Sequence, residues 1–279
     1  MTALSAADFE YIRGFIRTRS AIVLEPGKEY LVESRLTPVV RKEGLGSIES
    51  LVRKLREGGA KGLERMVVEA MTTNETSFFR DITPFEALRK QIIPELIERR
   101  ASSRRLDIWS GACSSGQETY TMLMLLREHF PQLASWTVRV HATDLSTQMV
   151  ERTQAGLYSQ LEVNRGLPAA MLVKYFERSG ENWQVVKALR SMVEARTLNL
   201  DAPWSGLCQM DIVLMRNVLI YFDVATKKEI LGRVRSQMRP DGYLFLGSAE
   251  TTIGLDESFQ RVQIDKASCY QLAGLAVAR

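Results

Sequence analysis

The fold of this chain is decided by Leu106-Asp107-Ile108-Trp109-Ser110-Gly111-Ala112-Cys113-Ser114-Ser115-Gly116-Gln117-Glu118. An apolar run typical of a strand ends in a turn rich in glycine and serine, and a helical pattern begins directly after that turn. In α/β proteins, such a turn lets a ligand approach the backbone amides at the start of a helix. The stretch therefore predicts an α/β domain with a ligand site at the turn.

The next apolar run along the chain, Val138-Arg139-Val140-His141-Ala142-Thr143-Asp144, ends in an acidic residue. A carboxylate at the tip of the second strand is well placed to accept hydrogen bonds from the two hydroxyls of a ribose. Together, the turn and Asp144 predict a pocket for a cofactor that contains adenosine.

The turn also discriminates between cofactors. A dinucleotide site usually carries GxGxxG, whereas Gly111-Ala112-Cys113-Ser114-Ser115-Gly116 lacks the middle glycine that lets the backbone approach a pyrophosphate. A kinase-type phosphate loop needs GK[ST], and here Gly116 is followed by Gln117-Glu118. S-adenosylmethionine has no phosphate group and suits a GxxxxG turn, so we predict this cofactor.

The organisation of the chain follows from its periodicity. The residues up to about 74 show helical spacing, a further helix is predicted at 83–100 with Pro94 inside it, and strands then alternate with helices. Such alternation predicts a parallel sheet covered on both faces, with a final antiparallel hairpin at its edge. Pro38 either starts a new helix or kinks one helix. The predicted strands are 105–110, 137–143, 193–198, 211–215, 243–248, 260–265 and 268–272, and the helices of this part are 116–130, 146–155 and 224–237.

The composition of the 279 residues, 45% hydrophobic and 25% charged, is that of an ordinary globular protein. No apolar run approaches a membrane span, the start of the chain lacks the pattern of a signal peptide, and the three cysteines are scattered. We therefore expect a cytoplasmic protein with neither a disulfide framework nor a metal site. The net charge of +4 suits any acidic partner, and the basic excess is concentrated in residues 33–65, at Arg35, Arg41, Lys42, Arg53, Lys54, Arg56, Lys61 and Arg65.

Several motifs, in the same order along nearly the whole chain, resemble those of the CheR family, the bacterial chemotaxis methyltransferases that methylate glutamate side chains of chemoreceptors. Thr72-Thr73-Asn74-Glu75-Thr76-Ser77-Phe78-Phe79-Arg80 resembles the signature that joins the two domains of that family. The turn at 109–118, the strand end at 142–144 and Asn199-Leu200 continue the match. The other matching motifs are Met215-Arg216-Asn217-Val218-Leu219-Ile220-Tyr221-Phe222, Pro240-Asp241-Gly242 and Gly247-Ser248-Ala249-Glu250.

The resemblance implies a role for particular residues. Tyr221 would contact the substrate carboxylate, and an arginine of the interdomain helix, for which Arg99 and Arg100 are both candidates, would take part in catalysis. The residues implied to bind the cofactor are Asn74, Thr76, Arg80, Gly111, Glu118, Asp144, Asn199, Leu200, Arg216 and Asn217.

Several of these residues also have purely structural explanations. Asn74 and Asp144 could each cap a helix, and Glu118 could be a favourable charge in a first helical turn. Arg216 could form a structural ion pair.

The resemblance further implies the domain organisation. It comprises a small helical domain at 1–74 that docks on the receptor, a linker and helix at 75–100, and a Rossmann-like methyltransferase domain at 101–279 with an insert at about 157–192. The edge hairpin belongs to the last domain, and we expect a monomer.

The expected partner is the cytoplasmic helical domain of a chemoreceptor, with no nucleic acid and no membrane insertion. Two alternatives stay open. One is a nucleic-acid methyltransferase, although the chain lacks both an Asn-Pro-Pro-Tyr motif and an aromatic cluster beside its basic residues. The other is a module that binds the cofactor without catalysis.

Overall fold

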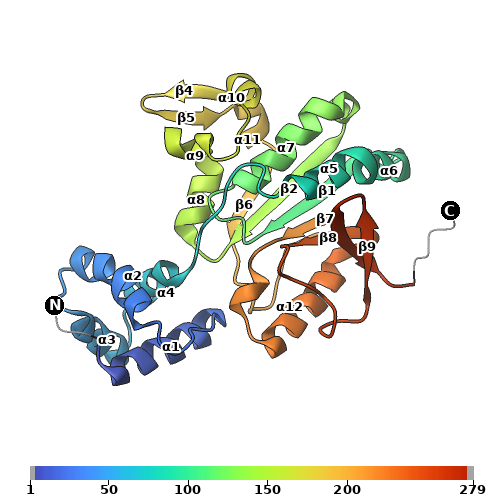
Figure 1. Cartoon of the computed structure of the whole chain (residues 1–279). Helices are drawn as coiled ribbons and strands as arrows, with labels where there is room; N and C mark the ends of the chain where they lie inside the picture. The colour runs from blue at the N-terminus through green and yellow to red at the C-terminus, as the bar shows by residue number, and fades with distance from the viewer. Residues whose placement is uncertain (1–3, 275–279) are drawn as a thin grey trace. The chain divides into compact units, whose positions relative to one another are not determined.

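A seven-stranded sheet forms the centre of the larger part of the protein in the computed structural model, which describes residues 4–274 (Figure 1). The strand order is β6-β2-β1-β7-β8-β10-β9, and all neighbouring pairs are parallel except those that involve β10. The strands are β1 (Arg105–Gly111), β2 (Thr137–Asp144), β6 (Val193–Thr197), β7 (Met210–Met215), β8 (Met238–Leu246), β9 (Phe259–Ile264) and β10 (Ala267–Leu272). This α/β fold with its edge hairpin confirms the prediction.

The chain changes direction across the sheet between β1 and β7. From β1 it moves outward to β2 and β6, and it then returns to the other side of β1 with β7. Ligands of open α/β sheets bind at such a switch point, outside the carboxyl ends of the strands. Because Gly111 is paired with Thr143 and Met215 with Leu246, the ends of four strands meet along one edge.

The helices of this part pack on the sheet through apolar side chains. Those on one face share a single core with strand residues at alternating positions, such as Ile108, Val140 and Ile212, as expected from the two-residue period of a strand. The helices are α5 (Ile82–Ala87), a π-helical turn (Leu88–Ile92), α6 (Ile93–Arg99), α7 (Gln117–His129), the 3-10 turn Pro131–Ser135, α8 (Thr147–Ala155) and α12 (Val224–Gln237).

The single helix predicted at 83–100 is wrong in one respect, since the π-helical turn Leu88–Ile92 divides it. Pro94 lies in the first turn of α6, where its missing N–H would have no partner in any case. The changed hydrogen-bond register before Pro94 lets the chain continue as a helix.

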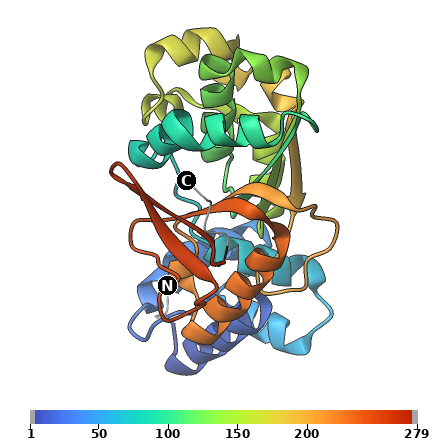
Figure 2. The same cartoon turned by 90° about the vertical axis from the view of Figure 1, so that its right-hand side faces the viewer.

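An insert between α8 and β6 folds around a second, three-stranded antiparallel sheet, at the opposite edge of the main sheet from the hairpin (Figures 1 and 2). Ser159 and Glu162 form a capping box at the start of its first helix. Its elements are β3 (Leu157–Tyr158), α9 (Gln160–Asn164), α10 (Ala169–Tyr175), β4 (Phe176–Ser179), β5 (Asn182–Val185) and α11 (Lys187–Arg190).

A second compact unit comprises the helical residues before Asn74 together with Tyr221–Thr226. Ser5 and Ser47 cap α1 and α3 by accepting backbone N–H bonds with their side chains. Pro38 lies inside one continuous helix, which settles the alternative left open by the sequence. The helices are α1 (Ala6–Ser20), α2 (Glu29–Lys42), α3 (Ile48–Glu57) and α4 (Lys61–Met71).

The remaining described residues, Asn74–Ile220 and those from Lys227 onward, form the other compact unit, which contains the seven-stranded sheet. Residues 1–3 and 275–279, which belong to the predicted first and last domains, lie outside the described residues. No helix of the described part is both long and apolar enough to cross a membrane.

Gly166 fits the insert against the segment that precedes α5. Its φ is +87°, and a Cβ atom there would lie 2.1 Å from the carbonyl oxygen of Phe78. We expect Gly166→Ala to lower the free energy of unfolding by about 2 kcal/mol or more, because backbone must move in addition to the cost of a left-handed conformation.

Gly180→Ala is the matched control, since Gly180 also has a positive φ of 60° but no atom within 4 Å of its virtual Cβ. Thermal and urea unfolding of the full chain would measure both variants. Equal losses of stability would contradict the proposed clash.

Candidate cofactor and active site

The turn after β1 is held open by contacts with the end of β2. Ala112 and Ser114 have φ values of 55° and 51°, in the left-handed region. The amide of Cys113 donates to the carbonyl of Thr143 at 2.9 Å, and the amide of Ser114 donates to Oδ2 of Asp144 at 2.8 Å. The turn and the predicted ribose-binding carboxylate are therefore directly connected.

Asp144 is 6% exposed, and its other carboxylate oxygen accepts the amide of Ser146 at 2.9 Å. Ser146, not Asp144, is the N-cap of α8, because its side chain accepts the amide of Met149. The helix-cap explanation of Asp144 is therefore wrong. Its carboxylate joins two loops at the carboxyl edge of the sheet.

Glu118 lies in the first turn of α7 and forms an ion pair with Arg216 at the end of β7. The side chain of Arg216 is 2% exposed and also bonds to Asp81 Oδ2 at 2.8 Å and to the carbonyl of Arg80 at 3.1 Å. Burial raises the pKa of Glu118, and the opposing effect of Arg216 is smaller. The ion-pair explanation of Arg216 is thus realised, with two carboxylates, beside the turn.

The segment between the units, residues 74–81, is tied to the same edge. The Asn74 carbonyl accepts the hydroxyl of Ser114 at 2.8 Å, and the Phe79 amide donates to Thr121 Oγ1 of α7 at 3.1 Å. Arg80 donates to the Glu75 carbonyl at 3.1 Å, and its own carbonyl accepts from Arg216. Asn74, Thr76 and Arg80 therefore belong to one segment fixed at the carboxyl edge.

Asn199 and Leu200 follow β6 and lie near Asp144. The amide of Leu198 donates to the Asp144 carbonyl at 2.9 Å, and the Asn199 carbonyl accepts the indole N–H of Trp204 at 3.3 Å. The carbonyl of Leu200 accepts Arg233 Nη1 at 2.7 Å. The loop is thus held in place mainly through its backbone.

The end of β7 contains a contact that the sequence analysis missed. Glu250 accepts the amides of Asn217 at 2.8 Å and Gly247 at 2.6 Å, and also that of Ile220 at 3.3 Å. Asn217 has a φ of 59°, and a Cβ on Gly247 would lie 2.7 Å from its Nδ2. The signal was visible as a glutamate just after the Gly-Ser-Ala turn that ends β8.

Two of the predicted glycines have packing reasons to lack a side chain. A Cβ on Gly111 would lie 3.1 Å from Cε of Met215, so the ends of β1 and β7 approach closely there. A Cβ on Gly116, where φ is +90°, would lie 2.9 Å from two atoms of Thr153. Any role of Gly111 toward the cofactor is additional to this packing.

Arg99 and Arg100, the two candidates for a catalytic arginine, are both engaged in ion pairs away from the turn. Arg100 bonds to Asp211 at 2.7 Å and to Asp241 at 2.5 and 3.0 Å, and Arg99 pairs with Glu95. Asp211 is the second residue of β7, so both arginines lie at the amino edge of the sheet, about 13 Å of strand away from the carboxyl end. These ion pairs hold α6 to the amino edge. At the carboxyl edge, the segment at 74–81 contributes a different arginine, Arg80.

Tyr221 belongs to the helical unit. Its carbonyl accepts the amide of Val23 at 2.9 Å, and the neighbouring Asp223 pairs with Arg17 at 2.8 Å. Burial lowers the pKa of Arg35, and a smaller opposing effect comes from Tyr221, so these two side chains share an environment.

Asp107, His141 and Cys208 form a second cluster, in which one ligand atom of each lies within 4.8 Å of the others. Burial opposes the ionisation of Asp107, but hydrogen bonds from His141 and Arg105 prevail and keep its pKa well below the usual range. Because Arg105 occupies both carboxylate oxygens of Asp107 at 2.6 and 3.0 Å, the cluster is an ion-pair network around β1 and β2.

Family models match both parts of the chain. Residues 74–268 match the SAM-binding domain of CheR methyltransferases, and residues 7–72 match their all-alpha domain. The chain belongs to the CheR methyltransferase family. The predicted family and cofactor are thereby confirmed, since SAM is S-adenosylmethionine.

Similar proteins match over almost their whole length. "Chemotaxis protein methyltransferase Cher2" of Pseudomonas putida is 43% identical, over 95% of this chain and 97% of that protein. "Chemotaxis protein methyltransferase 1" of Pseudomonas aeruginosa shows the same identity and coverage. "Chemotaxis protein methyltransferase 1" of Vibrio cholerae is 38% identical, over 98% of this chain and all of that protein.

The residues at the carboxyl edge fit S-adenosylmethionine chemically. Glu118 and Asp144 offer carboxylates to an ammonium group and a ribose, and Arg80 offers a cation to a carboxylate. Asn217 Oδ1 is buried and has no hydrogen-bond partner within the described residues, as expected where a ligand supplies the donor. The individual contacts of these residues with the cofactor stay predictions.

The raised pKa of Glu118 has a measurable consequence. If its carboxylate binds the cofactor ammonium, affinity for S-adenosylmethionine falls as the pH drops through that pKa, which happens at a higher pH than for an exposed glutamate. Calorimetric titrations across the acidic range would measure this dependence. Glu118→Gln should weaken binding by about 1.5–3 kcal/mol and remove the pH dependence due to this group. Identical affinity and pH profiles of the two proteins would refute the assignment.

Proposed function

We propose that this chain transfers the methyl group of S-adenosylmethionine to glutamate side chains of chemoreceptors and so forms glutamate methyl esters. The observation that carries the proposal is the similarity to chemotaxis protein methyltransferases at 38–43% identity over both units. The fixed carboxyl edge, with Glu118, Asp144 and Arg216 around one turn, provides the site for the transfer.

A carboxylate substrate agrees with the placement of histidines. The chain has two: His129 ends α7, and His141, in the middle of β2, contacts Asp107. An alcohol or amine nucleophile would need a base to remove its proton, for which histidine is the commonest choice. A glutamate, with a pKa near ~4.3, is already ionised at pH 7 and needs none.

The mechanism then depends on how the substrate carboxylate and the cofactor are oriented. Bound S-adenosylmethionine supplies an electrophilic methyl group on a positively charged sulfur. Tyr221 donates one hydrogen bond to the substrate carboxylate and directs an oxygen, while Arg80 binds the carboxylate of the cofactor. A bidentate arginine on the substrate would stabilise the anion and reduce its nucleophilicity, so one phenol is the better donor. Proximity and alignment can supply about 7–11 kcal/mol.

Docking is assigned to the predicted helical domain at 1–74. Arg41, Lys42 and Arg53 are exposed on α2 and α3. Arg35 differs from them, because its guanidinium bonds to the carbonyls of Met71 and Thr72 at 2.6 and 2.9 Å. Arg35 therefore holds the end of α4 in addition to any contact with a receptor. The partner is the acidic, cytoplasmic helical part of a chemoreceptor, and the enzyme acts in the cytoplasm as a monomer without nucleic acid.

The decisive experiment is mass spectrometry of chemoreceptor fragments after incubation with the protein and S-adenosylmethionine. We expect an added methyl group on glutamate that is removed by mild alkali, as esters are. Methylation of lysine or of RNA instead, with none on receptor glutamate, would refute the proposal.

Tyr221→Phe should lower kcat/KM for the receptor about tenfold, because one hydrogen bond to a charged group is lost. The affinity for S-adenosylmethionine should stay that of the parent. Tyr30→Phe, which changes an exposed tyrosine of the same unit, is the control. Methyl transfer by Tyr221→Phe at the parent rate would remove Tyr221 from the mechanism.

The double charge reversal Arg41→Glu/Lys42→Glu should raise KM for the receptor several-fold, since each exposed ion pair contributes about 0.2–1 kcal/mol. The Kd for S-adenosylmethionine should not change. Lys228→Glu on α12 provides a control with one reversed charge on an exposed helix. A KM equal to that of the control would show that α2 does not face the substrate.

A further inference from the structure

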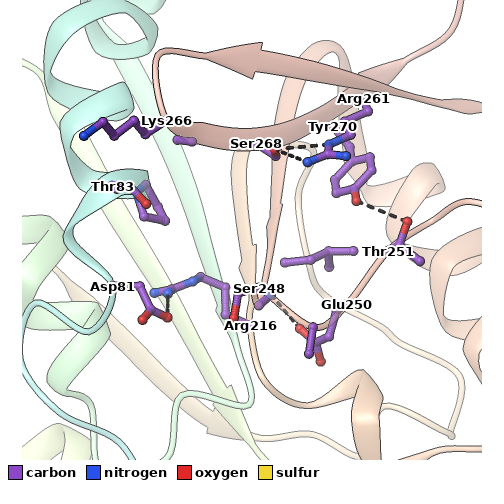
Figure 3. A pocket seen from close by; sticks show the side chains of 15 residues that line it. Asp81, Thr83, Arg216, Ser248, Glu250, Thr251, Arg261, Lys266, Ser268 and Tyr270 are labelled. Atoms are coloured by element: carbon purple, nitrogen blue, oxygen red, sulfur yellow. Dashed lines mark hydrogen bonds and ion pairs between the residues drawn. The ribbon is translucent and has the colours of Figure 1, made fainter.

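A cavity of about 440 Å³ opens between the start of α5, the loop after β8 and the β9–β10 hairpin (Figure 3). All of its lining residues belong to the unit that contains the seven-stranded sheet. Its volume lies in the range of sites that bind small ligands or short peptide segments. The cavity shares Arg216 with the predicted cofactor site, because this guanidinium also pairs with Glu118.

The two carboxylates that line the cavity are already engaged. Asp81 bonds to Arg216, and Glu250 accepts three backbone amides. Figure 3 shows Asp81 beside the end of Arg216, with Glu250 below the hairpin. These acids therefore contribute to the structure of the wall and offer little to a cationic ligand.

The cations of the hairpin are engaged differently. Arg261 donates to the Ser268 hydroxyl at 2.7 and 3.1 Å, and Lys266 lies near the hairpin turn (Figure 3). Within residues 4–274, neither has an acidic side chain at ion-pair distance. Asp81 and Arg216 pair with each other, so Arg261 and Lys266 determine the charge that the lining offers to a ligand. The hydroxyls of Thr83, Ser248 and Thr251 add further hydrogen-bond donors.

We propose that this cavity is a subsite for an acidic side chain of the polypeptide substrate, next to the glutamate that is methylated. The inference rests on the proposed function and extends it to a site that Arg261 and Lys266 define. Cations and hydroxyls in a concave site favour a carboxylate, through charge-assisted hydrogen bonds. The shared Arg216 places this subsite next to the cofactor site, where a side chain near the methyl acceptor would arrive.

The test measures binding of an oligo-glutamate decapeptide to the full chain saturated with S-adenosylhomocysteine, by calorimetry at low salt. Arg261→Glu/Lys266→Glu should weaken this binding about tenfold, as two reversed charges at a partly exposed site would do. Lys228→Glu, which lies outside the cavity, should bind like the parent. An oligo-glutamine decapeptide should not bind.

Several outcomes would overturn the proposal. The decapeptide could bind the hairpin variant as tightly as the parent, while Arg41→Glu/Lys42→Glu abolishes binding. This result would place the acidic contact on the helical unit alone. Free glutamate could bind as tightly as the decapeptide, which would make the cavity a site for a small anion. Because the assay needs no turnover, these outcomes are distinct from a failure of receptor methylation.

With receptor fragments as substrate, the hairpin variant should raise KM and leave kcat and the affinity for S-adenosylmethionine unchanged. A fall in kcat at unchanged KM would assign Arg261 and Lys266 to the structure of the site and not to substrate binding.

Discussion

A single buried guanidinium, that of Arg216, holds the carboxyl edge of the sheet together. It connects the end of β7 with Glu118 of α7 and with Asp81 and the Arg80 carbonyl in the interdomain segment. Breaking a buried ion pair by removal of one partner typically costs about 3–5 kcal/mol, since a charge then remains without compensation. Arg216 therefore links the helix after the turn to the segment at 74–81, and it also lines the hairpin cavity.

The two edges of the sheet use the same chemistry for different purposes. At the amino edge, Arg100 joins Asp211 and Asp241, and Arg105 joins Asp107, so these pairs fasten helix α6 and the starts of the strands. At the carboxyl edge, Asp144 accepts the amide of Ser114 in the turn, and Glu118 pairs with Arg216. Ligands of open α/β sheets bind at this carboxyl edge, outside the ends of the parallel strands.

Glu250 fixes the backbone of the loops after β7 and β8, although these loops form no regular element. Its carboxylate collects three amides from the ends of β7 and β8, and Ile220, the last of them, directly precedes Tyr221. The backbone of Asn217, one of the residues predicted to bind the cofactor, is therefore fixed by a side chain from the loop after β8. Because the Glu250 carboxylate is engaged by these amides, the basic residues of the neighbouring cavity determine the charge of that cavity.

The sequence alone determined which segments along the chain form helices and strands. It also determined the turn after β1, the acid at the tip of β2, the edge hairpin and the cofactor. These features are local, because a glycine-rich turn or an alternating strand is encoded within a few neighbouring residues. Only the tertiary structure decided which charges meet. Arg216 finds Glu118 and Asp81 across 98 and 135 residues, and Arg100 finds Asp241 across 141, which moves Arg99 and Arg100 away from the site. The periodicity of the sequence cannot encode such pairings, since they depend on which strand ends become neighbours when the sheet forms.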